Sequence, residues 1–330
     1  MKSIFEIRPQ VWQLDGTEME VEVIRASKTN TGAPPIFTLR MRYPRIIHAE
    51  IMTHRVFSRN ARSSRAVPVK TMLMETTTIP FIPWHWGANQ KGMQAGAECN
   101  EIVEIGREYD GSIMPYSREE AWLEVRDRAL EVAKGMMEAG YHKQIPNRLL
   151  EPFMWIDTLI TSTQWSNFLW LRDHEAAEPH LRDLARVVTV ALAGAKIQTL
   201  KPGEWHLPYF NEADWEEAKF QAESFPMKIS AARSARISYA PFDGDASYER
   251  ELERYNSLVS SDRVHASPLE HQATPDEMVT ASIDLFEDEN ETLTPSETLD
   301  AQRVYKHKQK HGNLTGWIQF RKTVPNENHV

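Results

Sequence analysis

The segment Phe37-Thr38-Leu39-Arg40-Met41-Arg42-Tyr43 alternates apolar and polar residues and stops at Pro44. Alternation with a period of two is typical of a strand that buries one face, and proline is poorly tolerated within a sheet. A strand is therefore predicted over 37–43. The next segment, 46–57, predicts a helix that places Glu50, Thr53 and His54 within one turn of each other. A strand that leads directly into a helix favours a mixed fold.

Three further segments predict helices. The first, 122–136, ends before Gly140, a residue typical of helix C-terminal caps. Its apolar side chains recur at helical spacing and are expected to be core: Trp122, Val125, Ala129, Val132, Ala133 and Met136. The segments 152–172 and 180–200 are rich in large apolar residues, and 229–239 fits either a strand or a helix. These elements predict an α+β fold of two layers.

Composition limits the kind of protein this can be. The chain has 330 residues with 38 basic and 47 acidic side chains, a net charge of −9, which disfavours a surface built for nucleic acid or an anionic membrane. A lone cysteine, Cys99, excludes an internal disulfide and a multi-cysteine zinc site. The longest small-apolar run, 187–195, is shorter than the roughly 18 residues of a membrane span, and the N-terminus lacks a signal-peptide core. A cytoplasmic location is expected.

Charge is distributed unevenly along the chain. Residues 41–70 contain seven basic side chains and one acid, whereas 241–300 contain 16 acids and three arginines. The acidic interval is typical of a solvated, partly loop-like region. In the basic interval, the segment 54–65 combines arginines with serines, donors that suit phosphate oxygens. It fits a phosphorylated small molecule, a nucleic-acid backbone or a solvated basic loop.

The spacing within this segment resembles the signature of the flavin-dependent thymidylate synthases, the ThyX family. That signature is Arg-His-Arg, seven residues, serine and, two positions further, arginine; here it reads Thr53-His54-Arg55, Ser63 and Arg65. A second segment, Asn167-Phe168-Leu169-Trp170-Leu171-Arg172, is similar to the Asn-Phe-Leu-x-Leu-Arg motif of the family. Two separate motifs support the resemblance.

Two more segments resemble the family, but in a different order. Residues 230–238 and 265–271 are similar to motifs that normally precede the arginine signature. The chain is therefore expected to be a long form with permuted or partly duplicated motifs. A core would span 1–205, and a partial ThyX-like module would span 206–330.

The resemblance implies an enzyme with long helices packed on a mainly antiparallel sheet. It implies that dUMP is methylated at C5 to dTMP through FAD, with methylenetetrahydrofolate as the carbon donor and NADPH as the reductant. It also implies a homo-oligomer, usually a homotetramer, with active sites between subunits. A flavin route needs no enzymic thiol, and the acids beside Cys99 would raise a thiol pKa.

The resemblance also implies a role for each site residue. Arg172 is the predicted catalytic residue, because a fixed cation beside the pyrimidine favours ionisation at N3 and makes C5 nucleophilic. The substrate nucleotide is expected at Glu50, Thr53, Arg62, Ser63, Ser64, Arg65 and Arg148. FAD is expected at Thr53, His54, Arg55, Val56, Asn60, Thr163, Asn167 and Ser267. Folate is expected near His265, and no metal site is predicted.

Two positions depart from the family pattern. Thr53 replaces the first arginine, and Glu50 replaces the usual glutamine. A carboxylate accepts hydrogen bonds, so Glu50 either favours an amino-bearing cytosine or pairs with a neighbouring arginine to organise the loop.

Three hypotheses follow. The first is a flavin-dependent thymidylate synthase, and the second is a related C5 methylase or hydroxymethylase of another pyrimidine nucleotide such as dCMP. The third is a non-catalytic nucleotide or nucleic-acid binding protein. Nucleic acid is the less favoured ligand, because the acidic interval offsets the basic one.

Overall fold

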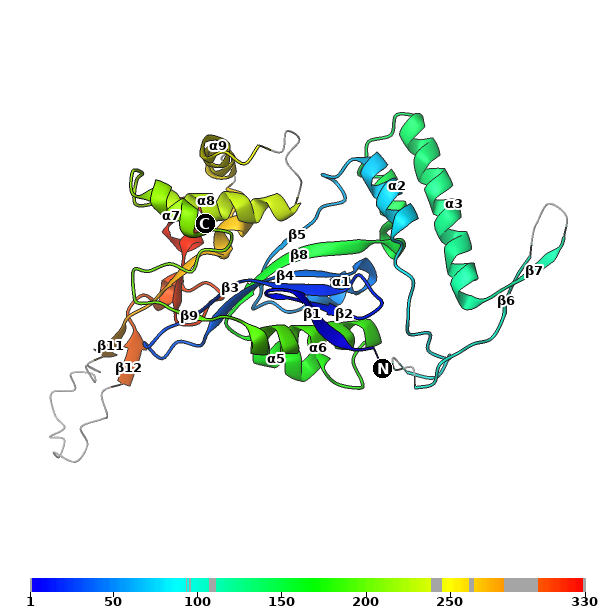
Figure 1. The fold of residues 1–330 in the computed structure, drawn as a ribbon, viewed down its shortest axis with the longest axis horizontal. Coiled ribbons are helices and arrows are strands. Elements are labelled where there is room, and N and C mark those ends of the chain that lie inside the picture. Colours follow the sequence, from blue (N-terminus) through cyan, green and yellow to red (C-terminus); the bar gives the residue numbers. More distant parts are fainter. Residues whose placement is uncertain are drawn as a thin grey trace, which may run out of the picture.

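A seven-stranded sheet forms the centre of the molecule (Figure 1). The computed structural model describes residues 2–92, 94, 96–106, 111–238, 245–260, 264–281 and 302–328. The strands of the central sheet are β1 (Ile4–Arg8), β2 (Val11–Leu14), β3 (Glu20–Lys28), β4 (Ile36–Pro44), β5 (Ser58–Ala61), β8 (Trp155–Ser162) and β9 (Gln198–Thr199). Their order is β1-β2-β3-β4-β8-β5, with β9 beside β3. The β3–β9 pair is parallel, and the other pairs in this sheet are antiparallel.

The strand predicted over 37–43 is β4, and its alternation separates the two faces of the sheet. Leu39 and Met41 are buried in a core that they share with Leu184 and Val188 of α6 (Pro179–Gly194). Burying each such side chain contributes about 2 kcal/mol. Figure 1 shows α6 and α5 (Trp165–Arg172) together on one side of the sheet. Gly194 ends α6 against the indole of Trp12, where a Cβ atom would collide with the ring.

The opposite face of the sheet carries ion pairs. Arg40 lies 3.3 Å from Glu22 and 3.7 Å from Asp157, which is also 3.2 Å from Arg42. These side chains come from β3, β4 and β8. Carboxylates of the neighbouring strands β3 and β8 therefore neutralise the two arginines of the alternating segment.

The helix predicted over 152–172 is wrong in its first half, which forms β8. This strand pairs with β4 on one side and β5 on the other, so both its edges are covered. The β-branched residues Ile156, Ile160 and Thr161 suit such a central strand. A buried strand reads as a continuous apolar run, which periodicity does not separate from a buried helix.

The helix predicted over 46–57 is shorter than expected. It consists of a 3-10 turn, Arg45–Ile47, and α1 (His48–Ile51). Thr53 ends it by donating its hydroxyl (2.7 Å) and its amide (3.2 Å) to the carbonyl of Glu50, which a continuing helix would use for the amide of residue 54. The chain then turns into β5.

A helical group stands beside the sheet. It contains α2 (Val69–Thr78), α3 (Arg118–Glu138) and α4 (Pro146–Leu149). A capping box at Ser117 and Glu120 begins α3, and Gly140 follows its end with a φ of +85°, as its predicted capping role requires. Of the predicted apolar stripe, Ala133 is buried, but Val125 and Val132 are exposed, so the prediction that the whole stripe is core is wrong.

The C-terminal region forms a second helical group. Its elements are α7 (Glu212–Ala218), α8 (Phe225–Ala235), the 3-10 turn Arg236–Ser238, α9 (Tyr248–Val259), the 3-10 turn Ser267–Glu270, β10 (Ala273–Pro275), β11 (Met278–Ala281), β12 (Gln302–Tyr305), the 3-10 turn Lys308–Lys310, β13 (Trp317–Gln319) and the 3-10 turn Phe320–Thr323. Its helices pack around a core that includes Leu207, Ile229 and Phe320, while Ala273 of β10 and Trp317 of β13 are buried in a separate cluster with Ile36 of β4. The ambiguous segment 229–239 is thus helical as far as the structure describes it, to residue 238.

The acidic interval 241–300 is only partly described. Within it α9 is a regular helix, where Glu251 is fully buried between Arg236 (2.9 Å) and Arg254 (2.5 Å). Residues 282–300 lie outside the described residues. The division at 205/206 stays a prediction.

The α+β fold with long helices and a mainly antiparallel sheet is confirmed. No helix in the described part of the chain is long and apolar enough to cross a bilayer.

Candidate functional site

Arg172 meets three predicted site residues where α5 and α1 end. Its Nε donates to Nε2 of His54 (3.0 Å), and its Nη2 donates to Oγ1 of Thr53 (3.2 Å). Its Nη1 lies 3.6 Å from Oε2 of Glu50. Residues from the two signature motifs therefore contact one another directly.

His54 is held as a neutral hydrogen-bond acceptor. Its ring packs against Phe57 at 5.5 Å and edge-on against Phe168 at 5.0 Å. Burial, together with the positive charges of Arg172 and Arg59, lowers the pKa of His54 to about 4. Because Nε2 accepts from Arg172, the proton of the neutral ring lies on Nδ1. A buried, neutral imidazole thus fixes the direction of the Arg172 guanidinium.

A cavity of about 770 Å³ opens beside this cluster. Its wall includes Glu50 and Arg172 together with His85, Glu98 and Glu178. The last three were not predicted, because they lie in segments that match neither motif. The one signal in these segments is the aromatic run Pro83-Trp84-His85-Trp86-Gly87, and an aromatic cluster of this kind is more typical of a core or an interface than of a ligand site. In the structure Trp84 does pack against Trp155 with stacked rings 6.2 Å apart, while His85 reaches the cavity.

Acidic side chains shape the electrostatics of the cavity. Burial and the negative charge of Glu178 raise the pKa of Glu50, against the opposing effect of Arg172. Glu178 also caps α6, since its carboxylate accepts from the amide of Leu181 at 2.7 Å. His85 also lines the cavity, and its Nε2 lies 2.8 Å from Oδ2 of Asp183. A polar ligand in this cavity would meet Arg172 and several carboxylates.

The predicted phosphate loop is closed by its own ion pairs. Arg62 forms a two-point contact with Glu75 at 2.7 and 2.9 Å. Ser64 donates to Glu151 (3.0 Å), which also lies 3.7 Å from Arg148. These acids pair with three of the residues that were expected to face a phosphate: Arg62, Ser64 and Arg148.

Backbone contacts reinforce this loop. The buried amide of Asn147 donates to the carbonyls of Ser64 (2.7 Å) and Val67 (3.0 Å). The amide of Ser63 donates to the carbonyl of Ser238 (3.2 Å), and its hydroxyl accepts from the amide of Arg65 (3.2 Å). The Arg65 side chain is exposed.

The residues expected at FAD divide into buried and exposed sets. Asn60 and Thr163 are buried, and the Thr163 hydroxyl accepts from the amide of Thr315 at 3.1 Å. Oδ1 of Asn60 is buried without a hydrogen-bond partner among the described residues. Arg55 and Asn167 are exposed, so their side chains are accessible from the surface. Val56 is half-buried, and its carbonyl accepts from the Ser162 hydroxyl at 3.3 Å.

Ser267 and His265 belong to the C-terminal group. Both are exposed, in and just before the 3-10 turn that packs against β5. The structure brings them to the sheet edge, while the contacts of Arg172 are with Glu50, Thr53 and His54.

Comparisons with known proteins give partial matches. No family model matches the chain, and no curated protein matches it. A flavin-dependent thymidylate synthase ThyX from Helicobacter pylori, complexed with FAD and dUMP, is 16% identical, with a TM-score of 0.30 over 48% of this chain and 67% of that chain. A UMP/dUMP methylase PolB from Streptomyces cacaoi, bound with 5-Br UMP, is 16% identical, with a TM-score of 0.36 over 54% of this chain and 89% of that chain.

Proposed function

We propose that this protein is a flavin-dependent C5 methylase of a pyrimidine nucleotide. In this proposal dUMP is converted to dTMP, with methylenetetrahydrofolate as the carbon donor and NADPH as the reductant through FAD. The contact of Arg172 with Thr53, His54 and Glu50 beside a cavity carries the proposal. Two motifs far apart in the sequence supply one cluster.

In this proposal Arg172 stabilises negative charge that develops on the pyrimidine ring. A guanidinium fixed by His54 and Thr53 needs no reorientation when charge develops at N3, so C5 becomes nucleophilic at a lower free-energy cost. Glu50 partly offsets this cation. Its raised pKa makes protonation easier, and protonation would leave Arg172 free to act on the ring.

FAD would supply the hydride transfer to the bound carbon unit. In this proposal Arg55 and Asn167 hold it, because their side chains are exposed near the ends of the two motifs. Exposed residues of this kind suit a cofactor that a second subunit covers.

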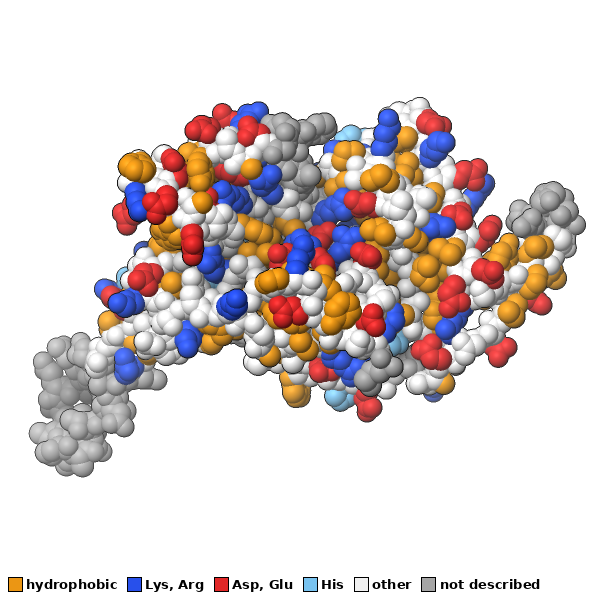
Figure 2. Space-filling view, viewed as in Figure 1, with side chains coloured by type: hydrophobic (Ala, Val, Ile, Leu, Met, Phe, Trp, Pro, Cys, Tyr) orange, Lys and Arg blue, Asp and Glu red, His pale blue; other side chains and the backbone are white. Residues whose placement is uncertain are grey.

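The proposed homo-oligomer is supported by exposed apolar side chains. Ile102 and Ile113 are 60% and 63% exposed at the hairpin formed by β6 (Val103–Gly106) and β7 (Ile113–Tyr116). Figure 2 shows hydrophobic side chains gathered over this hairpin. On α5 Trp170 is 77% exposed, two residues from Arg172. Contact with another subunit would remove these surfaces from water.

Light scattering tests the oligomer. The double variant Ile102→Asp/Ile113→Asp is expected to lower the molar mass towards that of the monomer, because charges in an apolar interface oppose association. The control is Phe220→Asp, at an even more exposed apolar side chain in the C-terminal group. A monomeric mass for the unmodified protein would refute the proposed assembly.

The absorption spectrum of the purified protein tests the reaction. Without oxygen, flavin bands should bleach on addition of NADPH and return only when dUMP and methylenetetrahydrofolate are both present. Product mass then distinguishes methyl from hydroxymethyl transfer. A protein that stays colourless after addition of FAD would refute the proposal and favour a non-catalytic nucleotide-binding role.

The Glu50 carboxylate, which lines the cavity, favours a second candidate substrate, dCMP. An ionised Glu50 can accept a hydrogen bond from the amino group of cytosine, which dUMP lacks. The variant Glu50→Gln should lower turnover of dCMP relative to dUMP by about tenfold, measured as the ratio of kcat/KM values. Turnover of dUMP with no product from dCMP would remove this candidate.

A further inference from the structure

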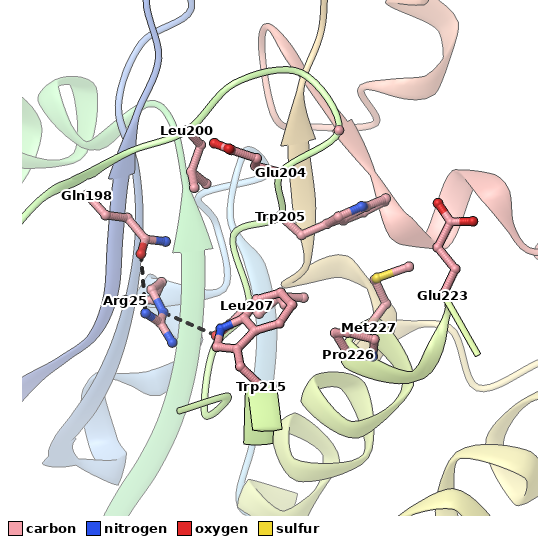
Figure 3. Close-up of a pocket in the computed structure, with 11 residues that line it drawn as sticks. Arg25, Gln198, Leu200, Glu204, Trp205, Leu207, Trp215, Glu223, Pro226 and Met227 are labelled. Atoms are coloured by element: carbon pink, nitrogen blue, oxygen red, sulfur yellow. Dashed lines mark hydrogen bonds between the residues drawn. The ribbon is translucent and has the colours of Figure 1, made fainter. Parts of the chain in front are cut away.

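A second cavity lies between the sheet and the C-terminal helices. Its volume is about 430 Å³, and it shares no lining residue with the cavity at Arg172. Figure 3 shows Arg25 of β3 and Gln198 of β9 on one side, and Pro226 and Met227 of α8 on the other. The two signature motifs contribute nothing to it, so its ligand is a separate question.

Two indole rings form the aromatic part of this cavity. Trp205 is oriented by Phe320, at 5.9 Å and 89°, and Trp215 by Phe210, at 4.9 Å and 79°. Trp215 remains 47% exposed although it lies on a helix that packs in the C-terminal core. Rigid, partly exposed indoles present area for a planar aromatic ring at little cost in conformational entropy.

Arg25 supplies a cation that no carboxylate neutralises within the described residues. Its Nε donates to the carbonyl of Leu207 (3.2 Å), its Nη2 donates to the carbonyl of Phe210, and its Nη1 donates to Oε1 of Gln198 (3.4 Å). A guanidinium carries more N–H donors than these acceptors use. The remaining N–H donors are available to an anionic ligand.

Contacts behind the cavity hold Arg25 in place. Nε2 of Gln198 donates to the Ser27 hydroxyl (3.0 Å), which lies 2.8 Å from Nδ1 of the buried His206. The other ring nitrogen of His206 lies 2.8 Å from the hydroxyl of Thr38. This series of hydrogen bonds fixes the side-chain amide of Gln198, so that the amide oxygen faces Arg25. A cation oriented in advance binds an anion with less loss of entropy.

We propose that this cavity binds a planar aromatic carboxylate, with its ring against Trp205 and Trp215 and its carboxylate on Arg25. A planar carboxylate matches adjacent N–H donors of a guanidinium. The cavity also contains Glu204 and Glu223, which disfavour a doubly charged phosphate more than a singly charged carboxylate. The site is independent of the proposed flavin chemistry.

Anthranilate (2-aminobenzoate) is a suitable probe, because its own fluorescence anisotropy rises when it binds a protein. The unmodified full chain, without nucleotide or flavin, should bind it saturably. Anthranilamide, the uncharged analogue, should bind at least about tenfold more weakly, and phenyl phosphate should also bind more weakly. Equal affinity for anthranilate and anthranilamide, or no saturable binding of anthranilate, would overturn the proposal.

Variants identify the site. Trp215→Ala should raise the Kd for anthranilate by about tenfold, whereas Trp170→Ala, at an exposed tryptophan on α5, should leave it unchanged. Arg25→Gln should raise it by about thirtyfold or more, provided its circular dichroism spectrum is that of the unmodified protein. Arg25→Lys keeps the charge and should give an intermediate Kd. Unchanged binding in both Trp215→Ala and Arg25→Lys would place the ligand elsewhere.

Discussion

Arg172 and Arg62 are equally sheltered, with side chains 21% and 18% exposed, but their partners differ. Arg62 makes a two-point contact with the carboxylate of Glu75, which takes up its charge and its geometry. Arg172 is fixed mainly by the neutral His54 and Thr53, and Glu50 lies further away at 3.6 Å. An arginine held by neutral groups keeps its charge available to an anion, whereas one paired with a carboxylate does not. The partners of the arginines therefore indicate an anion site better than the number of arginines in a segment does.

The pair Arg172→Ala and Arg62→Ala tests this comparison most strongly. Loss of Arg172 should lower turnover of dUMP by about a thousandfold, because the charge on the pyrimidine would be unsupported. Loss of Arg62 should lower it by less than about tenfold, because its guanidinium faces Glu75. Steady-state kinetics on both variants decides the matter. A larger loss with Arg62→Ala would mean that the loop opens to take the phosphate.

The lowered pKa of His54 offers a second test, through the pH dependence of the free energy of unfolding. Because its pKa in the folded protein is lowered from 6.5 to about 4, the unfolded chain binds the proton more readily. Its contribution to stability is complete above about pH 6.5 and is lost as the pH falls towards 4. Urea unfolding should therefore show a weaker pH dependence for His54→Gln than for the unmodified protein across this range.

The other histidines with low pKa values, such as His48 and His271, remain in both proteins and serve as the internal reference. Identical pH dependence in the two proteins would mean that His54 does not hold the neutral state that orients Arg172.

The smallest expected effect is on the free energy of unfolding, and it concerns the ion pair of Arg62 rather than Arg172. Arg62→Ala leaves Glu75 without its partner and should lower the free energy of unfolding by about 1 kcal/mol. The double variant Arg62→Ala/Glu75→Ala should recover part of that loss, because no unpaired charge remains. Chemical denaturation of the two single variants and the double variant measures the coupling. Zero coupling energy would show that this ion pair does not fix the loop.

Local patterns predicted part of the fold. The alternation before Pro44 identified β4, and the capping position of Gly140 identified the end of α3. The strand β8 was missed because it is buried on both faces, so its residues do not alternate between apolar and polar, and its pairing with β4 and β5 shows what it is. Pairing with distant strands therefore determined that residues 155–162 form a strand.

The candidate site was predictable to the same extent. The motifs predicted Arg172 and His54, and the structure joins them. Glu151 could have been suspected as a partner of Arg148, three positions earlier on a helical turn. The tertiary fold brings Glu75 to Arg62, and it brings His85 to the cavity at Arg172. No sequence spacing predicts either contact. The charges that decide what an arginine can bind were thus the least predictable part.

The carboxylate of Glu178 has evolutionary consequences. It begins α6 and also borders the cavity at Arg172, so a mutation there would fray a core helix while it changed the ligand environment. Natural variation in substrate choice should therefore avoid this position. The lining also includes Gly87 and Gln90, which lie outside any helix and can change at little cost to folding. Among relatives of this chain, new specificities should arise at these positions first.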